Sequence, residues 1–397
     1  MQRKDSSTDM ANETDNKKKG MIVDKTKKGF SLIYRLFIYV PTVLLLLSVL
    51  FACLSQYVAP TKFMLFSYFG LGFPIILLLC VVWAVTLTYL NAWRALLLHA
   101  LFLFCLPMAK KTIPFNVSTS SFIMANDSTE NNADSTFKIL TYNVEGLSKE
   151  KGKSPMEISE YLCYEDADIC MIQEFSTYIT DEKYPKAFKK LFQKYPYTTR
   201  ENNEKLEWSV VILSKYPILN SEVVTEGNKS NKAIAADIVI KGDTIKAISC
   251  HLMSNRITPS DKNAIKKIVK GNDPVDDLEN AVSTFDSKFL TSYTIRENMA
   301  RDLARYINRT KQNIVLAGDF NDVPISYAYH KIKGDKLLCA KEEVGVGYNH
   351  TFNEFPFLFC IDHIMYSKSL ECISYFRDKV NYSDHYPSMA RFKIKKK

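Results

Sequence analysis

The chain begins with a polar stretch and then changes to long apolar runs. Leu36–Tyr57 and Phe63–Trp93 contain no charged residue, and each exceeds the ~20 residues that a helix needs to cross a bilayer. A third apolar run, residues 95–109, is short for a span but fits if the bilayer thins. A cleaved signal peptide does not fit, because its apolar core has only about 7–15 residues near the N-terminus. We therefore expect two or three transmembrane helices within residues 31–110.

Basic residues indicate how these helices are oriented. The leader, residues 1–30, is rich in lysine, and such basic clusters stay in the cytoplasm. Three spans place the C-terminal part of the chain on the extracytoplasmic side of the inner or plasma membrane, whereas two spans leave it inside. Arg94 suits an inside loop and favours three spans, while Lys110 and Lys111 argue for two.

The pattern changes again after the apolar runs. Residues 111–135 are mostly rich in Ser, Asn, Thr and Asp without periodicity, which is typical of a flexible linker. From residue 136 to 397, short β-branched runs alternate with helical patterns, which predicts two packed sheets with helices outside, an α/β sandwich. The predicted helices are Ser154–Glu165, Lys186–Lys194 and Tyr293–Thr310. The predicted strands are Phe137–Asn143, Ile169–Gln173, Ser209–Ser214, Ala235–Ile240, Thr244–His251, Ile314–Gly318, Cys360–Ser367 and Ser388–Ile394, with a hairpin turn at Gly242-Asp243.

The net charge of +9 is unevenly distributed along the chain. Residues 1–135 hold 13 basic and 8 acidic residues, and the remainder holds 39 and 35. The lysines of the terminal KIKKK account for the excess in the second part, so the body of the C-terminal domain is close to neutral. Strong non-specific binding of nucleic acid needs clustered Lys and Arg, and the composition gives no support for it.

The cysteines do not suggest a disulfide framework. Of nine in the chain, the six in the C-terminal domain lie mostly inside apolar strand-like runs and show no metal-ligand spacing. We expect buried free thiols.

The predicted strands deliver polar side chains at their ends, where a rigid scaffold gathers reactive groups along one edge. Asp362 stands inside an apolar run, and since an isolated buried charge is prohibitive, we expect it to pair with His385. The set is rich in oxygen ligands, which suits Mg²⁺ or Mn²⁺ rather than Zn²⁺. It predicts metal-dependent hydrolysis of a phosphate ester by activated water. The set comprises Asn143, Glu145, Glu174, His251, Asp319, Asn321, Asp362, Asp384 and His385.

The ordered blocks YNVEGL, IQE, ILSKYPI, SCHL, GDFND, IDHI and SDHYP resemble the endonuclease/exonuclease/phosphatase superfamily over residues 136–397. The resemblance implies a four-layered α/β sandwich, with the site at one edge and an activity on phosphoesters. The apolar helices and the linker in front of it look like the anchor of membrane-tethered bacterial members.

The resemblance also implies a metal site. Glu174 would be the principal Mg²⁺ ligand, with Mn²⁺ as the alternative ion. Asn143, Glu145 and Asp384 would complete or support the metal shell. One departure from the family is Cys360, which stands where many members have a basic residue before Ile-Asp, so one phosphate or structural contact is in question.

The remaining residues acquire catalytic roles from the same resemblance. Asp319 and Asn321 would position the attacking water and the scissile phosphate. His385, held by Asp362, would act as a general base or stabilise the charge of the phosphoryl group. His251 would donate to a phosphate oxygen or protonate the leaving group.

Together these features predict a membrane-anchored, Mg²⁺-dependent phosphoesterase. Its substrate class stays open between lipids, small phosphoesters and nucleic acid, and so does the choice between monoester and diester cleavage. A tethered non-specific endonuclease is the first alternative, and a catalytically silent domain that binds a phosphorylated ligand is the second. The insertion Ile257–Thr284 has charges of both signs and does not identify a substrate. The bilayer is the expected partner, and no protein partner is evident.

Overall fold

The computed structural model describes residues 32–116, 136–147, 155–200, 208–228, 230–255, 275–354 and 359–395. The chain divides into two compact units. The first comprises Met1–Leu50 and Pro74–Cys105, and the second comprises Phe51–Phe73 and Leu106–Lys397. The predicted leader, residues 1–30, lies outside the described residues.

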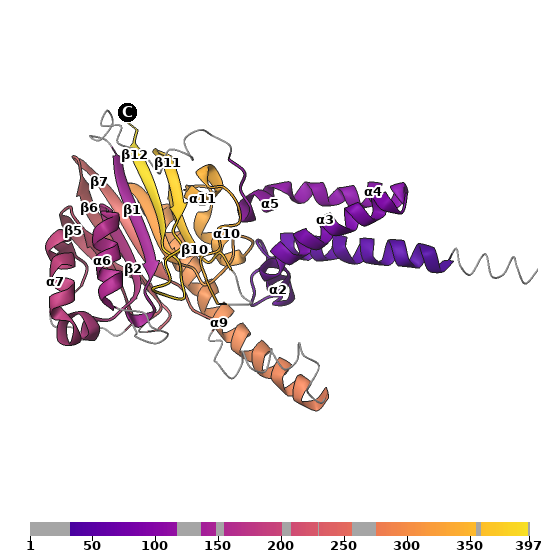
Figure 1. Cartoon of the computed structure of the whole chain (residues 1–397), viewed down its shortest axis with the longest axis horizontal. Coiled ribbons are helices and arrows are strands. Elements are labelled where there is room, and N and C mark those ends of the chain that lie inside the picture. The colour runs from indigo at the N-terminus through magenta and orange to yellow at the C-terminus, as the bar shows by residue number, and fades with distance from the viewer. Residues whose placement is uncertain are drawn as a thin grey trace, which may run out of the picture. The chain divides into compact units, whose positions relative to one another are not determined.

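The N-terminal part of the chain consists of apolar helices (Figure 1). Two of them, Leu32–Leu54 and Trp93–Thr112, are long and apolar enough to cross a membrane. The number rises to three if the bent pair α2 and α3 forms one span. These helices suggest membrane association and agree in length with the predicted two or three spans. The shorter elements are α2 (Leu65–Leu71), α3 (Phe73–Tyr89), α4 (Trp93–His99), η1 (Ala100–Cys105) and α5 (Leu106–Thr112).

The second unit contains two sheets. The first has the strand order β11-β12-β1-β2-β4-β3 and the second has the order β5-β6-β7-β8-β10-β9. The strands of the first sheet are β1 (Thr136–Asn143), β2 (Ile169–Phe175), β3 (Tyr197–Thr198), β4 (Ser209–Ser214), β11 (Leu370–Arg377) and β12 (Ser388–Ile394). Those of the second are β5 (Ile218–Glu226), β6 (Lys232–Ile240), β7 (Asp243–His251), β8 (Asn313–Asp319), β9 (Leu337–Cys339) and β10 (Asp362–Ser367).

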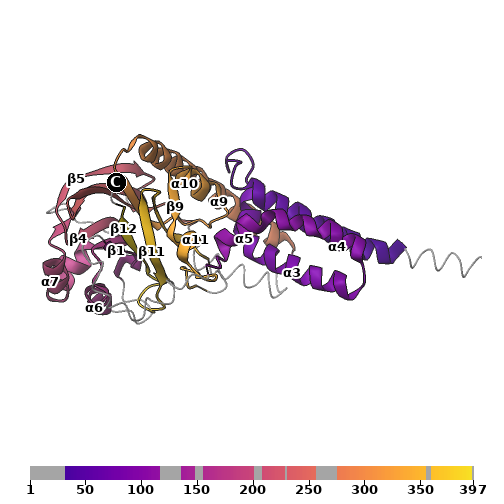
Figure 2. The ribbon, with the colours of Figure 1, turned by 90° about the horizontal axis from the view of Figure 1, so that it is seen from above.

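Helices cover the outer faces of both sheets, which completes the predicted four-layered α/β sandwich (Figures 1 and 2). Ile139 and Met171 of the first sheet and Ala247 and Val315 of the second share one core between the sheets. A second core lies between the first sheet and α6 and α7, and a third between the second sheet and α9 and α10. The helical elements are η4 (Glu145–Leu147), α6 (Pro155–Glu165), η6 (Tyr178–Lys183), α7 (Pro185–Lys194), α9 (Val275–Arg309), α10 (Tyr327–Lys333) and α11 (Ala340–Val344).

The eight predicted strands and three predicted helices all correspond to observed elements, although α9 begins earlier than its periodicity predicts. The hairpin turn lies one residue before the predicted position, at Lys241-Gly242, where φ is 51° and 90°. Positive φ at both central residues is what a two-residue hairpin turn requires. The strands that the sequence pattern missed include β5, β9 and β11, which lie at or next to sheet edges. None of the nine cysteines forms a disulfide, and the six within residues 136–397 are buried, as predicted.

The segment between the first apolar helices belongs to the second unit and packs against the sandwich. The Ser55 hydroxyl donates to the carbonyl of Ile325 at 2.8 Å, and the Thr61 hydroxyl donates to Glu297 at 2.9 Å. Most of the predicted linker, residues 117–135, lies outside the described part of the chain, as do residues 256–274 of the predicted insertion and its flank. Within the predicted linker, Phe115 forms a β-bridge with Val346.

Candidate active site

Sheet topology explains why the predicted polar residues meet at one edge. The parallel pairs β1/β2 and β7/β8 end in the same direction, whereas β10 and β12 are antiparallel to β8 and β1 and therefore begin there. In the register of β8 and β10, Asp362 lies directly opposite Asp319. The strand ends of both sheets thus provide the framework of a single site.

Asn143 connects the two sheets at this edge. Its side-chain amide donates to Glu174 Oε1 at 3.2 Å and to Asp319 Oδ2 at 3.1 Å, while its Oδ1 accepts from the backbone N–H of Glu145 at 3.1 Å. The Ser383 hydroxyl donates to the backbone carbonyl of Asn143 at 2.7 Å. Asn143 is buried, and its hydrogen bonds fix the relative position of carboxylates from both sheets.

The loop after β1 has an unusual backbone. Glu145, Gly146 and Leu147 have φ of 48°, 66° and 55°, and positive φ is uncommon for residues other than glycine. A Cβ on Gly146 would lie 2.9 Å from the Trp208 ring, so only glycine fits there. Such conformations concentrate at functional sites. Here the turn brings the Glu145 carboxylate within 3.2 Å of the backbone N–H of Asp384.

Glu174 is directed into the site by an irregularity in β2. The pairing of β2 with β4 shifts register between Ile172 and Phe175, and Glu174 has φ of 55°. A β-bulge re-aims side chains in this way. Burial raises the pKa of Glu174 to about 7, against the lowering effect of the His385 charge and of the hydrogen bond from Asn143.

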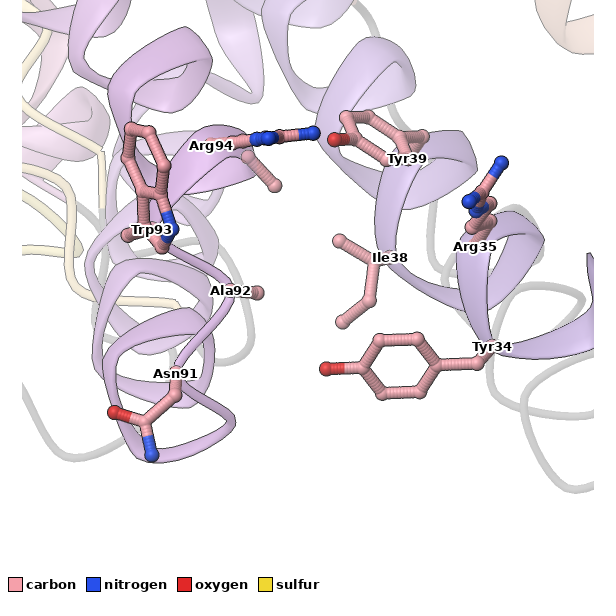
Figure 3. Close-up of a pocket in the computed structure, with 9 residues that line it drawn as sticks. Tyr34, Arg35, Ile38, Tyr39, Asn91, Ala92, Trp93 and Arg94 are labelled. Atoms are coloured by element: carbon pink, nitrogen blue, oxygen red, sulfur yellow. The ribbon is translucent and has the colours of Figure 1, made fainter. Parts of the chain in front are cut away.

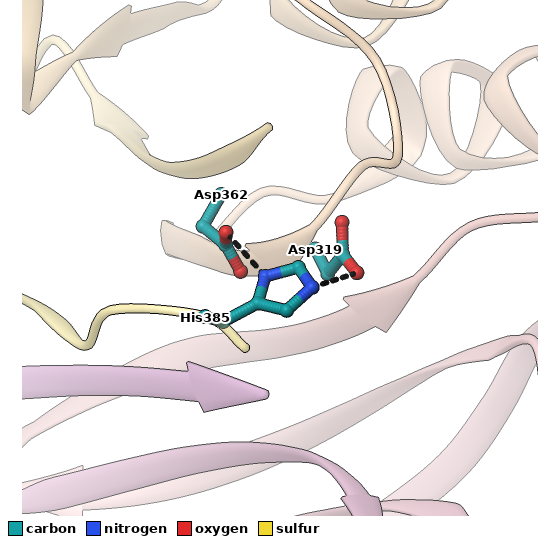
Figure 4. Close-up of side chains that lie close together, drawn as sticks. All are labelled: Asp319, Asp362 and His385. Carbon is teal, nitrogen blue, oxygen red and sulfur yellow. Dashed lines mark hydrogen bonds and ion pairs between the residues drawn. The ribbon is translucent and has the colours of Figure 1, made fainter. Parts of the chain in front are cut away.

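Three residues form a buried cluster of opposite charges (Figure 4). The imidazole Nδ1 of His385 donates to Asp362 Oδ2 at 2.9 Å, as expected from the sequence, and its Nε2 lies 3.8 Å from Asp319 Oδ2. Burial alone would lower the pKa of His385. The charges of Asp362 and Asp319 outweigh burial and hold the pKa of His385 well above its usual value. The ring is therefore an imidazolium between two carboxylates.

His251 approaches the same carboxylate from another strand. Its Nδ1 donates to the backbone carbonyl of Ser230 at 3.1 Å. Its Nε2 lies 3.6 Å from Glu174 Oε1 and 3.8 Å from Asp319 Oδ2, and within the described residues it has no hydrogen-bond partner. Burial lowers the pKa of His251, and the Asp319 charge only partly opposes this. His251 is therefore a neutral imidazole with the lone pair of Nε2 facing the site.

Asp319 and Asn321 form a compact turn at the end of β8. The backbone N–H of Asn321 donates to Asp319 Oδ1 at 2.7 Å, and the side-chain amide of Asn321 donates to the Leu252 carbonyl at 3.0 Å. Burial raises the pKa of Asp319 to about 6, although the charge of His385 opposes the shift. Asp319 is thus a carboxylate at neutral pH that receives hydrogen bonds from three donors.

The donor set fits a hard divalent cation. Glu174, Glu145 and Asp384 are close enough for the last two to raise the pKa of Glu174, and a cation would favour the ionised form of all three. Carboxylate and amide oxygens are also the ligands that Mg²⁺ prefers. Asn143 connects the predicted ligands. A different group of residues has ligand atoms that all lie within 4.8 Å of one another.

In the described part of the chain, that group is Asp319, Asp362 and His385. By distance alone, one ligand atom from each of these three residues could also hold a metal ion. The 2.9 Å contact between His385 Nδ1 and Asp362 Oδ2 is, however, a normal hydrogen-bond length. We therefore interpret this contact as a hydrogen bond and the cluster as an Asp–His–Asp assembly.

Several supporting residues escaped the sequence analysis. The Thr351 hydroxyl accepts from the backbone N–H of Asp362 at 3.0 Å, and the Ser230 carbonyl fixes His251. Arg296, fully buried, donates to Asp322 at 3.2 Å and to the Met253 carbonyl at 2.7 Å, which connects the loops after β7 and β8. Thr351, Ser230 and Arg296 do not follow an apolar run at a strand end, so the sequence pattern does not distinguish them.

Cys360 stands where many family members have a basic residue before Ile-Asp, and a lysine from another element lies beside it. The ammonium group of Lys341, on α11, lies 3.3 Å from Cys360 Sγ and donates to the carbonyl of Thr112 at 3.1 Å. Burial would raise the pKa of Cys360, but the Lys341 and His363 charges outweigh it and lower the pKa to about 7. The buried ammonium group of Lys341 therefore lies beside Cys360, the residue two positions before Asp362.

Comparison with known proteins identifies relatives of the whole sandwich. The model of the Endonuclease/Exonuclease/phosphatase family matches residues 140–385, and that of a domain of unknown function (DUF8431) matches residues 35–112. No curated protein matches the chain.

Solved structures give low-identity matches over the same region. One is the endonuclease/exonuclease/phosphatase from Bacteroides vulgatus, 17% identical, covering 66% of this chain and 99% of its own, with a TM-score of 0.47. Another is D. rerio TDP2 complexed with a single strand DNA product, 16% identical, covering 65% and 99%, with a TM-score of 0.47. A family protein from Leptotrichia buccalis is 16% identical and covers 65% and 100%, with a TM-score of 0.45.

Proposed function

Because the chain belongs to the endonuclease/exonuclease/phosphatase family, whose members hydrolyse phosphoesters, we propose that it is a membrane-anchored phosphoesterase that depends on a divalent cation. The observation that carries the proposal is the buried Asp362–His385–Asp319 assembly beside Glu174. Burying these charges costs free energy, and a domain that only bound a phosphorylated ligand would have no need of a second, neutral imidazole beside them.

We assign the cation to Glu174, with Asn143, Glu145 and Asp384 in support. Mg²⁺ is the ion that this oxygen-rich set suits best, and Mn²⁺ is the alternative. When bound, the ion would supply stabilisation of the negative charge that develops on the phosphoryl oxygens.

The charge of each remaining side chain determines its role in the reaction. Asp319 Oδ2 accepts a proton from the attacking water, whose oxygen forms the new bond to phosphorus. The imidazolium Nε2–H of His385 donates to a phosphoryl oxygen, so its raised pKa favours charge stabilisation over general-base catalysis. The proton that Asp319 accepts passes to Nε2 of His251, 3.8 Å away, and from there to the ester oxygen as the bond from phosphorus to that oxygen breaks. The products are an alcohol and a phosphate.

Lipids and small phosphoesters are the substrate classes that we favour. The near-neutral body of the domain and the apolar helices support them, because nucleic-acid binding draws most of its affinity from clustered positive charge. A tethered nuclease is the alternative within the family. We place the catalytic domain on the extracytoplasmic side, on the basis of three spans and the basic leader.

The test uses the full chain in detergent with Mg²⁺ or with EDTA. Phospholipid vesicles, supercoiled plasmid and bis(p-nitrophenyl) phosphate would be offered separately, and released head group, nicking and nitrophenol measured. Glu174→Gln and His385→Gln should each lower turnover by orders of magnitude. The matched control is Glu165→Gln. Glu165 is the last residue of α6, its carboxylate forms an ion pair with Lys138, and it takes no part in the site.

The outcomes separate the hypotheses. Turnover that survives EDTA, or that is unchanged in Glu174→Gln, contradicts the proposed metal-dependent mechanism. Nicking of plasmid that needs both Mg²⁺ and His385 would identify a tethered nuclease. Binding of a phosphoester without turnover of any substrate would support the catalytically silent alternative.

A further inference from the structure

A pocket lies at one end of the first unit, far along the chain from the active-site residues (Figure 3). Its volume is about 460 Å³. One wall comes from the beginning of the helix Leu32–Leu54, and the other from the turn between α3 and α4. Residues around position 35 and around position 94 are thus brought to the same cavity.

The pocket has a cationic, aromatic rim above buried apolar side chains. Ile38 and Ala95 are 2% and 1% exposed, and Figure 3 shows Ile38 pointing into the space between Tyr34 and Arg94. Arg35 and Arg94 are exposed at the rim. Tyr34 and Trp93 of the rim are exposed, and aromatic rings beside positive charge suit a ligand that is itself amphipathic.

Within the described residues, the positive charge of the two arginines is not neutralised. No acidic residue lines the pocket, and among the described residues neither Arg35 nor Arg94 has an ion-pair partner. Arg94 instead packs against the neighbouring Trp93, with its guanidinium carbon 5.5 Å from the ring centroid. The planar guanidinium fork matches the oxygens of a phosphate group, which it can bind through two parallel hydrogen bonds.

The walls are held in place by hydrogen bonds. The Tyr34 hydroxyl donates to the carbonyl of Leu90 at 3.2 Å, and the backbone N–H of Ala92 donates to the carbonyl of Leu87 at 3.0 Å. Asn91 makes the turn with φ of 51°, a conformation that asparagine tolerates better than most residues. The cavity is therefore a defined feature of the turn, which ties the two helices together.

A simpler explanation of the rim is the general enrichment of Arg, Trp and Tyr at the ends of transmembrane helices. That enrichment predicts a diffuse attraction to any anionic surface, in which a positive charge elsewhere near the membrane counts equally. It does not predict a lipid that is retained at one position. The exposed aromatic rings on both walls of one cavity are the feature that favours a bound molecule over a diffuse layer.

We infer that this pocket binds the phosphate-bearing headgroup of an anionic phospholipid. The phosphate lies between Arg35 and Arg94, and the first carbons of the lipid lie against the exposed rings of Tyr34 and Trp93. The inference is independent of the proposed hydrolytic activity, because it uses no residue of the active site, and it depends only on the association of these helices with a bilayer.

The experiment is native mass spectrometry of the full chain in detergent, with phosphatidylglycerol, phosphatidylcholine or inorganic phosphate added stepwise. One phosphatidylglycerol should be retained per chain, and phosphatidylcholine should be lost. Arg35→Gln combined with Arg94→Gln should weaken retention by roughly tenfold or more. The matched control is Lys62→Gln combined with Lys110→Gln, which removes the same charge from exposed positions outside the pocket and should leave retention unchanged.

Three outcomes would overturn the inference. These are the absence of a retained anionic lipid, an equal loss in both double variants, and displacement of the lipid by millimolar inorganic phosphate, which would identify a plain phosphate site. Turnover of bis(p-nitrophenyl) phosphate by the same preparations reports on folding, if the proposed activity holds. If that turnover is absent from every preparation, thermal unfolding midpoints replace it as the folding control.

Discussion

His385, in the loop before β12, and His251, at the end of β7, face the same carboxylate, and in each case Nε2 lies 3.8 Å from Asp319 Oδ2. Both rings are buried. The difference is the partner of Nδ1, which is the carboxylate of Asp362 for one ring and the carbonyl of Ser230 for the other. The pKa of His385 is raised well above its usual value, while burial lowers the pKa of His251.

The comparison shows that the atom behind an imidazole sets its charge when burial is the same. A carboxylate partner adds a full negative charge and stabilises the imidazolium, whereas a carbonyl only orients the neutral ring. One edge of the sandwich therefore holds a permanent proton donor next to a ring that can still take up a proton. Two such groups are what acid–base chemistry on a phosphoester needs.

Asp362→Asn should have the largest effect, because it gives His385 a neutral partner like that of His251. The pKa of His385 should fall, and the imidazolium would be lost at neutral pH. We expect turnover to fall on the order of 10³–10⁴-fold, as in hydrolases that lose the carboxylate behind a catalytic histidine. The measurement is kcat on the substrate identified in the screen.

The control for this variant is Asp378→Asn, because the Asp378 carboxylate accepts a hydrogen bond from Tyr161 at 3.2 Å and follows β11, an edge strand of the other sheet. Its kcat should be close to that of the unmodified chain. If Asp362→Asn were equally active, the charge of Asp362 would have no role in catalysis, and the contrast between the two histidines would be without consequence.

His251→Gln should have a smaller effect, roughly 10²-fold on kcat. Glutamine can still reach a carbonyl such as that of Ser230, but it cannot take up and release a proton. A substrate with a good leaving group, such as a nitrophenyl ester, should lose less than an alkyl ester, because its leaving oxygen needs no proton. Equal losses on both substrates would remove His251 from the protonation of the leaving group.

Thr351→Val should have a smaller effect still. The hydroxyl of Thr351 accepts from the backbone N–H groups of Ile361 and Asp362, each at 3.0 Å, so valine leaves the beginning of β10 less well fixed without changing any charge. Loss of such a supporting contact typically costs about 10–100-fold, and we expect the lower end. Thr351→Ser should restore kcat, whereas a purely packing role would leave the serine variant impaired.

The sequence predicted the interior strands and the site edge for the same reason. Core strands are apolar on both faces, so they read as continuous runs, and a polar residue at the end of such a run stands out. The edge strand β5 is mostly exposed and reads as a polar segment, and β9 has only three residues. Neither gives a periodic signal.

The hydrogen-bond partners of the two histidines also differ in whether the sequence could predict them. The pairing of Asp362 with His385 could be predicted, because a carboxylate in an apolar run needs a partner. The carbonyl of Ser230 and the hydroxyl of Thr351 could not, because a loop presents its backbone and hydroxyl groups without any pattern in sequence. The charge state of His251 follows from one of these loop contacts, so only the structure provides it.

The smallest predicted change is a shift of the pH profile. Asp319 must be ionised to accept the proton of water, so kcat/KM should fall as the pH decreases through about 6, the value to which burial raises its pKa. His385 must be protonated, and since its pKa is raised, the alkaline decline should begin well above pH 6.5. In Asp362→Asn the alkaline decline should move to lower pH while the acid limb stays near its original position. Because the groups are coupled, the limbs report on the assembly rather than on single residues. A profile whose alkaline limb is the same in both proteins would mean that His385 does not act as the imidazolium, and that the two histidines are equivalent in the reaction.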